Sequence, residues 1–175
     1  MKQQLIVTIL GGNNMGILSE ISNTVSATGC NILDSRQAIY GEDFSLTMIL
    51  EGSQLEITKA ELKIPQTCQS HDLLSMMKRT KRHSKQNLEH LIDVQISGDD
   101  IPGVIHKVSA LLTSFDAAIS ALRQHTFTDQ DSQKEKMKVK FVASMPLEGD
   151  MTGLTTQFHA LLDSLNLSGK ISENH

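Results

Sequence analysis

Two short polar turns carry the residues with the clearest capacity for ligand chemistry. Each turn is expected to lead into a helix, where unpaired backbone N–H groups and the positive end of the helix dipole point at one spot. Such a spot suits a small carboxylate, and amide or carboxylate oxygens beside it can bind an ammonium or amide group. The candidate binding residues are Asn13, Asn14, Met15 and Gly16 in the first turn and Asp99, Asp100, Ile101 and Gly103 in the second.

A second interpretation of these residues is purely structural. Asn and Asp are common helix N-caps, because their side-chain oxygens accept hydrogen bonds from the first N–H groups of a helix. The polar turn residues would then stabilise the helices and bind nothing. The sequence leaves both interpretations open.

No group of residues has the spacing that catalysis or metal binding requires. Gly11 and Gly16 have the glycine spacing of a phosphate-binding loop. The two residues that follow, Ile17 and Leu18, stand where that loop needs Lys and Ser or Thr. The seven histidines are scattered, and the two cysteines lack the paired spacing of metal ligands. We therefore expect no catalytic site, no bound metal and no cofactor.

The composition excludes several classes of protein. The formal net charge is −4 and the pI about 5.9, which argues against a protein whose main task is to bind a phosphate backbone. No Trp, one Tyr and five Phe are too few for an aromatic platform that binds single strands. No segment reaches the ~20 apolar residues of a membrane span. These features predict a cytoplasmic protein without a membrane segment and without specific DNA binding of its own.

A long internal repeat organises the chain. Residues 5–37 return without a gap as residues 92–124. The matched positions include Gly11 with Gly98, Gly16 with Gly103, and Arg36-Gln37 with Arg123-Gln124. A repeat of this length, with its own strand and helix periods, is typical of a duplicated domain. We therefore divide the chain into a first domain at 1–80, a basic polar linker at 81–89 and a second domain at 90–175.

Hydrophobic periodicity predicts the same order of elements in each half. The first half reads as a central strand at 5–10 with two apolar faces, a helix at 15–28, strands at 31–40 and 44–50, a helix at 53–62 that ends before Pro65, and a strand at 73–78. The second half reads as strands at 90–97, 117–127, 137–143 and 167–172, with helices after Gly103 and at 154–165. The predicted fold is α+β: two tandem ferredoxin-like βαββαβ domains, each an antiparallel sheet with its helices on one face.

The turn residues also carry a family resemblance. The segment DDIPGVIHKVSALL resembles the D-x-P-G-(I/V/L) signature of ACT domains, and NNMGILSEISNTV resembles a variant with Asn for Asp and Met for Pro. The tandem layout, with EGS after the third strand and MMKRT before the linker, resembles the glycine cleavage system transcriptional repressor family. The resemblance implies an accessory regulator, not an enzyme. It would repress the glycine cleavage operon by contacting a LysR-type activator, and glycine would relieve the repression.

Two other functions fit the same residues. One is an ACT-only protein that binds an amino acid and has no role in transcription. The other is a detached regulatory subunit of an amino-acid metabolic enzyme. The absence of a helix-turn-helix pattern does not distinguish the three, and a homodimer is one of the assemblies that the sequence allows.

Overall fold

The computed structural model of the chain describes residues 2–81 and 89–174, and the chain divides into two compact units between Ser84 and Lys85. Most of the predicted linker, residues 82–88, lies outside the described residues. No described helix is long and apolar enough to cross a membrane.

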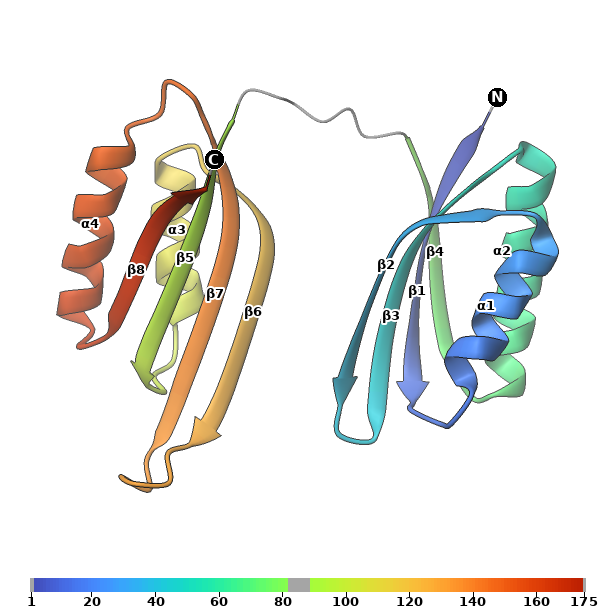
Figure 1. The fold of residues 1–175 in the computed structure, drawn as a ribbon, viewed down its shortest axis with the longest axis horizontal. Coiled ribbons are helices and arrows are strands. Elements are labelled where there is room, and N and C mark those ends of the chain that lie inside the picture. Colours follow the sequence, from blue (N-terminus) through green and yellow to red (C-terminus); the bar gives the residue numbers. More distant parts are fainter. Residues whose placement is uncertain (1, 82–88, 175) are drawn as a thin grey trace. The chain divides into compact units, whose positions relative to one another are not determined.

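Both units have the predicted βαββαβ order (Figure 1). The first unit contains β1 Gln3–Gly12, α1 Ile17–Thr28, β2 Asn31–Tyr40, β3 Asp43–Gly52, α2 Gln54–Ser70 and β4 Leu74–Thr80. The second contains β5 Glu89–Asp99, α3 Val104–Ser114, β6 Ala118–Thr128, β7 Glu135–Pro146, α4 Met151–Ser164 and β8 Ser168–Asn174. The sheets have the orders β2-β3-β1-β4 and β6-β7-β5-β8, with every neighbouring pair antiparallel. The prediction of two tandem ferredoxin-like domains is confirmed.

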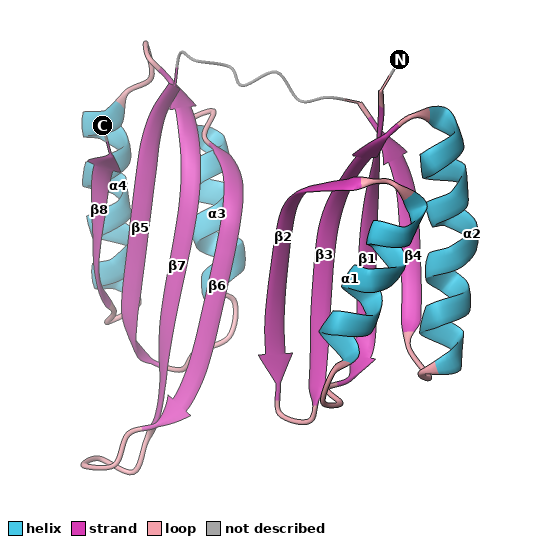
Figure 2. Cartoon of the chain, turned by 45° about the vertical axis from the view of Figure 1, so that its right-hand side comes forward, coloured by secondary structure: helices cyan, strands magenta, loops and turns pink. Residues whose placement is uncertain are grey.

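Each sheet has two helices on one face and none on the other (Figure 2). The core lies between the sheet and these helices, and the alternation of buried residues along the strands follows from the period of two. In the first unit Leu5, Val7 and Ile9 of β1 are buried against α1 and α2. As predicted, β1 is a central strand of its sheet, but only one of its two apolar faces is buried, since Leu10 on the opposite face is 46 % exposed.

Helix α2 is longer than the sequence indicated. It continues through Pro65 to Ser70, although an interior Pro removes one backbone hydrogen bond and costs about 3 kcal/mol. The buried stripe of α2 extends past the proline, since Ile64 and Cys68 are both buried. Burial of a side chain such as Ile64 contributes roughly 1.5–3 kcal/mol, so packing on both sides of Pro65 offsets the local cost.

The start of α2 is stabilised by residues close to it in the sequence. Ser53, the first residue of the predicted helix, caps α2 in a capping box with Glu56: the Glu56 N–H donates to Ser53 Oγ, and the Ser53 N–H donates to the Glu56 carboxylate. The hydrogen bond from the Ser53 N–H lowers the pKa of Glu56.

Both units also share a register shift in their edge strands, between Ile32 and Asp34 in β2 and between Ile119 and Ala121 in β6. This shared irregularity supports a duplication.

Candidate functional site

The two polar turns are attached to their sheets by equivalent backbone hydrogen bonds. The N–H of Asn13 donates to the carbonyl oxygen of Glu42 at 2.7 Å, and the N–H of Asp100 donates to that of Glu135 at 2.9 Å. Glu42 lies in the turn just before β3, and Glu135 is the first residue of β7. The turn between β1 and α1, and its counterpart between β5 and α3, is therefore held in the same place in both units.

The helices that follow these turns begin without a side-chain cap. Gly16 and Gly103 are the N-cap residues of α1 and α3, both in the left-handed region with φ of 85°, and neither helix start has a side-chain cap hydrogen bond. The interpretation of Asn and Asp as helix caps is therefore wrong. A Cβ added to either glycine would meet nothing within 4 Å. The glycines are needed for their backbone conformation, and the space above them is open.

A small hollow lies at each turn. The first has a volume of about 370 Å³ and is lined by Asn13, Asn14, Met15, Gly16, Ile17, Leu18 and Gln37. The second has a volume of about 290 Å³ and is lined by Asp100, Ile101, Pro102, Gly103, Val104, Ile105 and Gln124. These linings contain no Ser, Cys or His that a neighbouring base could activate. The groups that they present are backbone N–H, amide and carboxylate groups, which can form hydrogen bonds.

The sequence prediction of the site missed Gln37 and Gln124. They lie on β2 and β6, far along the chain from the turns, and tertiary structure brings them to the two hollows. Their repeat as Arg36-Gln37 and Arg123-Gln124 was the signal that could have identified them. Each side chain adds an amide that both donates and accepts hydrogen bonds.

Asp99 does not belong to the lining of the second hollow. It lies at the end of β5 and pairs across the sheet with Lys136 of β7, with 2.5 Å between Lys136 Nζ and Asp99 Oδ1. The hydrogen bond from Lys136 lowers the pKa of Asp99, and the same contact raises the pKa of Lys136. Asp100 is thus the carboxylate that the structure places at the hollow.

Two further repeated glycines have a packing role. A Cβ on Gly11 would approach Leu73 Cδ2 at 2.5 Å, and a Cβ on Gly98 would approach Leu167 Cδ2 at the same distance. These leucines are buried residues just before β4 and β8. Gly11 and Gly98 therefore let β1 and β5 pass close to the start of the last strand in each unit, and they do not line the hollows.

The two sites differ in how firmly their apolar residues are held. Ile101 is partly buried and packs against the second core, whereas Met15 is exposed over its whole surface, at 104 %. The first turn also lacks a charged residue where the second has Asp100, because Asn13 is the matching position. The second hollow therefore has the more defined wall and the only carboxylate in the two linings.

Comparison with known proteins agrees with this architecture. A family model described as "ACT domain" matches residues 3–78. The chain is 33 % identical over 168 residues to the glycine cleavage system transcriptional repressor of Escherichia coli (strain K12), and the match covers 96 % of this chain and 88 % of that protein. The chain belongs to the glycine cleavage system transcriptional repressor family.

One solved structure supports this membership over both units. A protein assigned as a glycine cleavage system transcriptional repressor is 29 % identical, with a TM-score of 0.74 and coverage of 99 % of this chain and 98 % of that one. A protein of unknown function from Galdieria sulphuraria has a TM-score of 0.79 over the full length of both chains but is only 17 % identical, so it shows the fold alone. This solved repressor and the present chain therefore share the same two-unit architecture.

Proposed function

We propose that this chain is an accessory regulator that represses the glycine cleavage operon and catalyses no reaction. The observation that carries the proposal is the relationship to the Escherichia coli repressor, which extends over both units. The regulator acts in the cytoplasm through a protein partner, a LysR-type activator of the operon, as the family resemblance implies. The net charge of −4 supports a protein partner over direct binding to operator DNA.

We further propose that the two hollows bind a small amino acid, with glycine the first candidate. The ligand carboxylate accepts hydrogen bonds from the N–H groups at the starts of α1 and α3, which have no side-chain cap. The helix dipole stabilises an anion there by about 0.3–1 kcal/mol. The ligand ammonium donates to Asp100 in the second unit and to the amide oxygen of Asn13 in the first. A ligand with so few atoms is expected to bind no tighter than micromolar.

Calorimetry tests the sensing part of this proposal. Glycine, serine and alanine are titrated to millimolar concentration into the full chain, and the Asn13→Ala, Asp100→Ala double variant is titrated in parallel. We expect heat with glycine and its loss in the double variant. No heat with any of the three ligands, or unchanged heat in the double variant, would remove the sensing hypothesis.

Reconstitution tests the partner. The purified chain is mixed with the purified LysR-type activator of the glycine cleavage operon, and complex formation is followed by size-exclusion chromatography with and without glycine. We expect a complex that glycine weakens. The chain alone is also assayed on operator DNA at physiological salt, where specific submicromolar binding would contradict action through a protein partner.

A further inference from the structure

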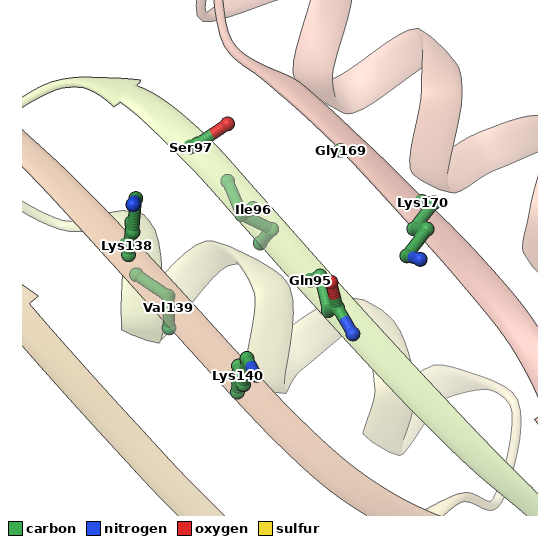
Figure 3. A pocket seen from close by; sticks show the side chains of 8 residues that line it. All are labelled: Gln95, Ile96, Ser97, Lys138, Val139, Lys140, Gly169 and Lys170. Atoms are coloured by element: carbon green, nitrogen blue, oxygen red, sulfur yellow. The ribbon is translucent and has the colours of Figure 1, made fainter.

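The open face of the second sheet, opposite α3 and α4, carries a row of cations. Residues in register across antiparallel strands project to the same face. One row crosses all four strands in the order Arg123, Lys140, Gln95 and Lys170. Figure 3 shows Gln95 on β5 between Lys140 on β7 and Lys170 on β8. This row contains three cations and no carboxylate.

The adjacent row continues the pattern toward the hairpin end of the sheet. It runs from His125 through Lys138 and Ser97 to Ser168. A hollow of about 540 Å³ lies over the part of these rows on β7, β5 and β8, and its polar lining residues are Gln95, Ser97, Lys138, Lys140 and Lys170. Within residues 2–81 and 89–174, no ion pair is recorded for Lys138, Lys140, Lys170 or Arg123. We call these two rows, from β6 to β8, the basic face.

The first unit shows that the fold does not require these cations. The row that matches Arg123, Lys140, Gln95 and Lys170 consists of Arg36, Thr47, Thr8 and Met76. Thr8 and Thr47 share a hydrogen bond between their hydroxyls at 3.1 Å, and Arg36 has an ion pair with Asp34. The first unit thus has two threonines and a paired arginine at positions where the second has Lys140, Gln95 and Arg123.

The basic face is unfavourable for folding taken alone. Like charges directly opposite each other across strands are destabilising, and Arg123 lies directly opposite Lys140. The protein is acidic overall, with a net charge of −4, so the cluster is not a consequence of composition. A cation cluster retained at a cost to stability is best explained by a negatively charged partner.

We propose that the basic face docks an acidic segment of a protein partner. Lys138 and Lys140 are two residues apart on one strand, which places them about 6.8 Å apart along β7. An extended segment with carboxylates at alternate positions has the same spacing. Gln95 and Ser97 between the lysine-bearing strands can hydrogen-bond to the backbone of such a segment, and electrostatic attraction speeds its association.

The observations favour a polypeptide over single-stranded nucleic acid. Nucleic acid would need an aromatic face on which bases stack, and Phe127 is the aromatic residue on this side of β6. Its ring stacks on His125 with 5.8 Å between centroids, and Lys138 Nζ lies 5.2 Å from its centroid. The ring is therefore engaged within the protein.

A peptide-binding experiment tests the proposal on the full chain. The probe is a fluorescein-labelled ten-residue peptide of alternating Glu and Ser, followed by fluorescence anisotropy in 50 mM salt. The test variant is Lys138→Gln, Lys140→Gln, Lys170→Gln. The matched control, Lys59→Gln, Lys63→Gln, Lys107→Gln, removes the same charge from exposed positions on helices α2 and α3. Circular dichroism confirms that both variants are folded.

We expect the test variant to bind the peptide about tenfold more weakly than the unmodified chain, and the control variant to change binding less than about twofold. Binding should also weaken as salt is raised, because these cations are exposed. Equal losses in both variants, or no peptide binding by the unmodified chain, would overturn the proposal. So would tighter binding of a ten-residue oligothymidine that is lost in the test variant, since the face would then serve nucleic acid.

This inference rests on the proposed function in one respect, that the regulator works through a protein partner. The two can fail separately. Glycine calorimetry on the test variant should give unchanged heat, because the basic face and the hollows share no lining residue. Loss of peptide binding with intact glycine binding would support docking on this face, whereas glycine binding lost in the test variant would contradict its independence from the sensing sites.

Discussion

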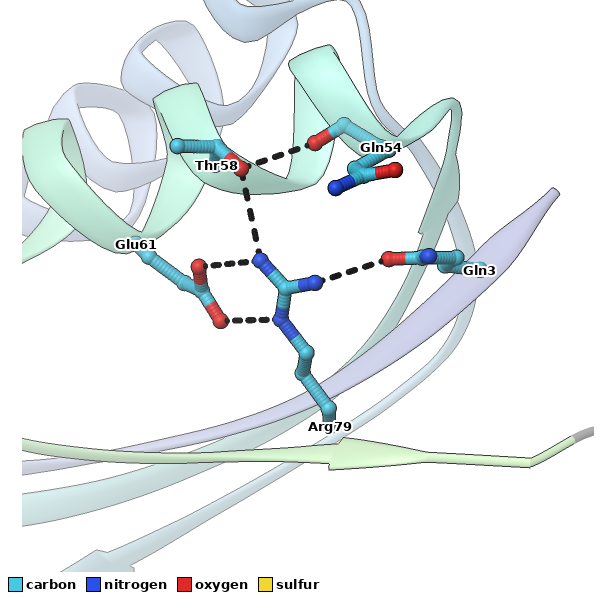
Figure 4. Close-up of polar contacts among 5 residues, drawn as sticks. All are labelled: Gln3, Gln54, Thr58, Glu61 and Arg79. Atoms are coloured by element: carbon cyan, nitrogen blue, oxygen red, sulfur yellow. Dashed lines mark hydrogen bonds and ion pairs between the residues drawn. The ribbon is translucent and has the colours of Figure 1, made fainter.

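Arg79 on β4 forms a bidentate ion pair with Glu61 on α2 (Figure 4). Its Nε donates to Glu61 Oε1 at 2.8 Å and its Nη2 to Glu61 Oε2 at 2.7 Å. The same guanidinium donates to Gln3 Oε1 on β1 at 2.9 Å and to the Thr58 hydroxyl at 3.3 Å. One side chain thus connects the edge strand, the central strand and the covering helix of the first unit.

Because of this contact, the first unit is expected to lose stability as the pH falls into the acid range. The hydrogen bond from Arg79 lowers the pKa of Glu61 below 4.5. A carboxylate with a lowered folded pKa contributes stability that is present above its unfolded pKa and is lost as pH falls through the folded value. We expect Glu61→Gln to lower the melting temperature by about 2–4 °C at pH 7, with a smaller difference at acid pH. Glu42→Gln, an exposed position in the same unit, is the control and should change little.

His90 gives the second unit the opposite pH dependence. Its Nε2 donates to the carbonyl oxygen of Leu147, and its Nδ1 contacts the Glu173 carboxylate. The Leu147 hydrogen bond and then Glu173 raise the pKa of His90 above 6.5. Stability from this group is fully present below pH 6.5 and is lost as pH rises through the folded pKa. NMR titration of the His90 ring should show the raised pKa, and Glu173→Gln should lower it; an unchanged pKa in that variant would contradict the pairing.

The two neighbouring aspartates should differ in ligand binding. Asp100 lines the second hollow, whereas Asp99 pairs with Lys136 outside it. If the ligand ammonium binds Asp100, Asp100→Asn should weaken glycine binding about tenfold or more, since a charge-assisted hydrogen bond contributes ~1.5–3 kcal/mol. Asp99→Asn is the matched control and should change affinity less than about twofold. Gln124→Ala should also weaken binding, and calorimetry on the three variants measures all these effects. Equal effects of the two aspartate variants would place the ammonium elsewhere.

Substitutions at the helix-start glycines should be limited by the left-handed backbone conformation and not by a lack of space for a side chain. Gly16 has a φ of 85° with open space around a Cβ, whereas Gly12 has no positive φ and a Cβ there would meet Asn14 Nδ2 at 3.6 Å. We expect Gly16→Val to destabilise the first unit by about 1–3 kcal/mol. Gly16→Asn should cost less, because Asn adopts the left-handed region more readily. Urea denaturation measures both, with Gly12→Val as the control. If the two valine variants lose the same stability, the positive φ is not the limiting factor.

Local patterns in the sequence were sufficient for the fold. The repeat of 5–37 as 92–124 identified the duplication, and the periods of strands and helices predicted the βαββαβ order that both units have. The end of α1 at Thr28 and the start of α2 next to Ser53 agree with the predicted helices at 15–28 and 53–62. These signals are reliable because capping and amphipathic burial involve residues close together in the chain. The end of α2 was missed because burial of Ile64 and Cys68 overrides the local preference of Pro65.

Only the tertiary structure decided which side chains meet. The sequence placed Asp99 and Asp100 together, but strand register pairs Asp99 with Lys136 and leaves Asp100 at the hollow. Register likewise brings Gln124 to the second turn and aligns Lys140 with Lys170 across Gln95. Local periodicity shows which face of a strand a residue occupies. The residue opposite it depends on how strands distant in sequence pair, because backbone hydrogen bonds across the sheet set that alignment.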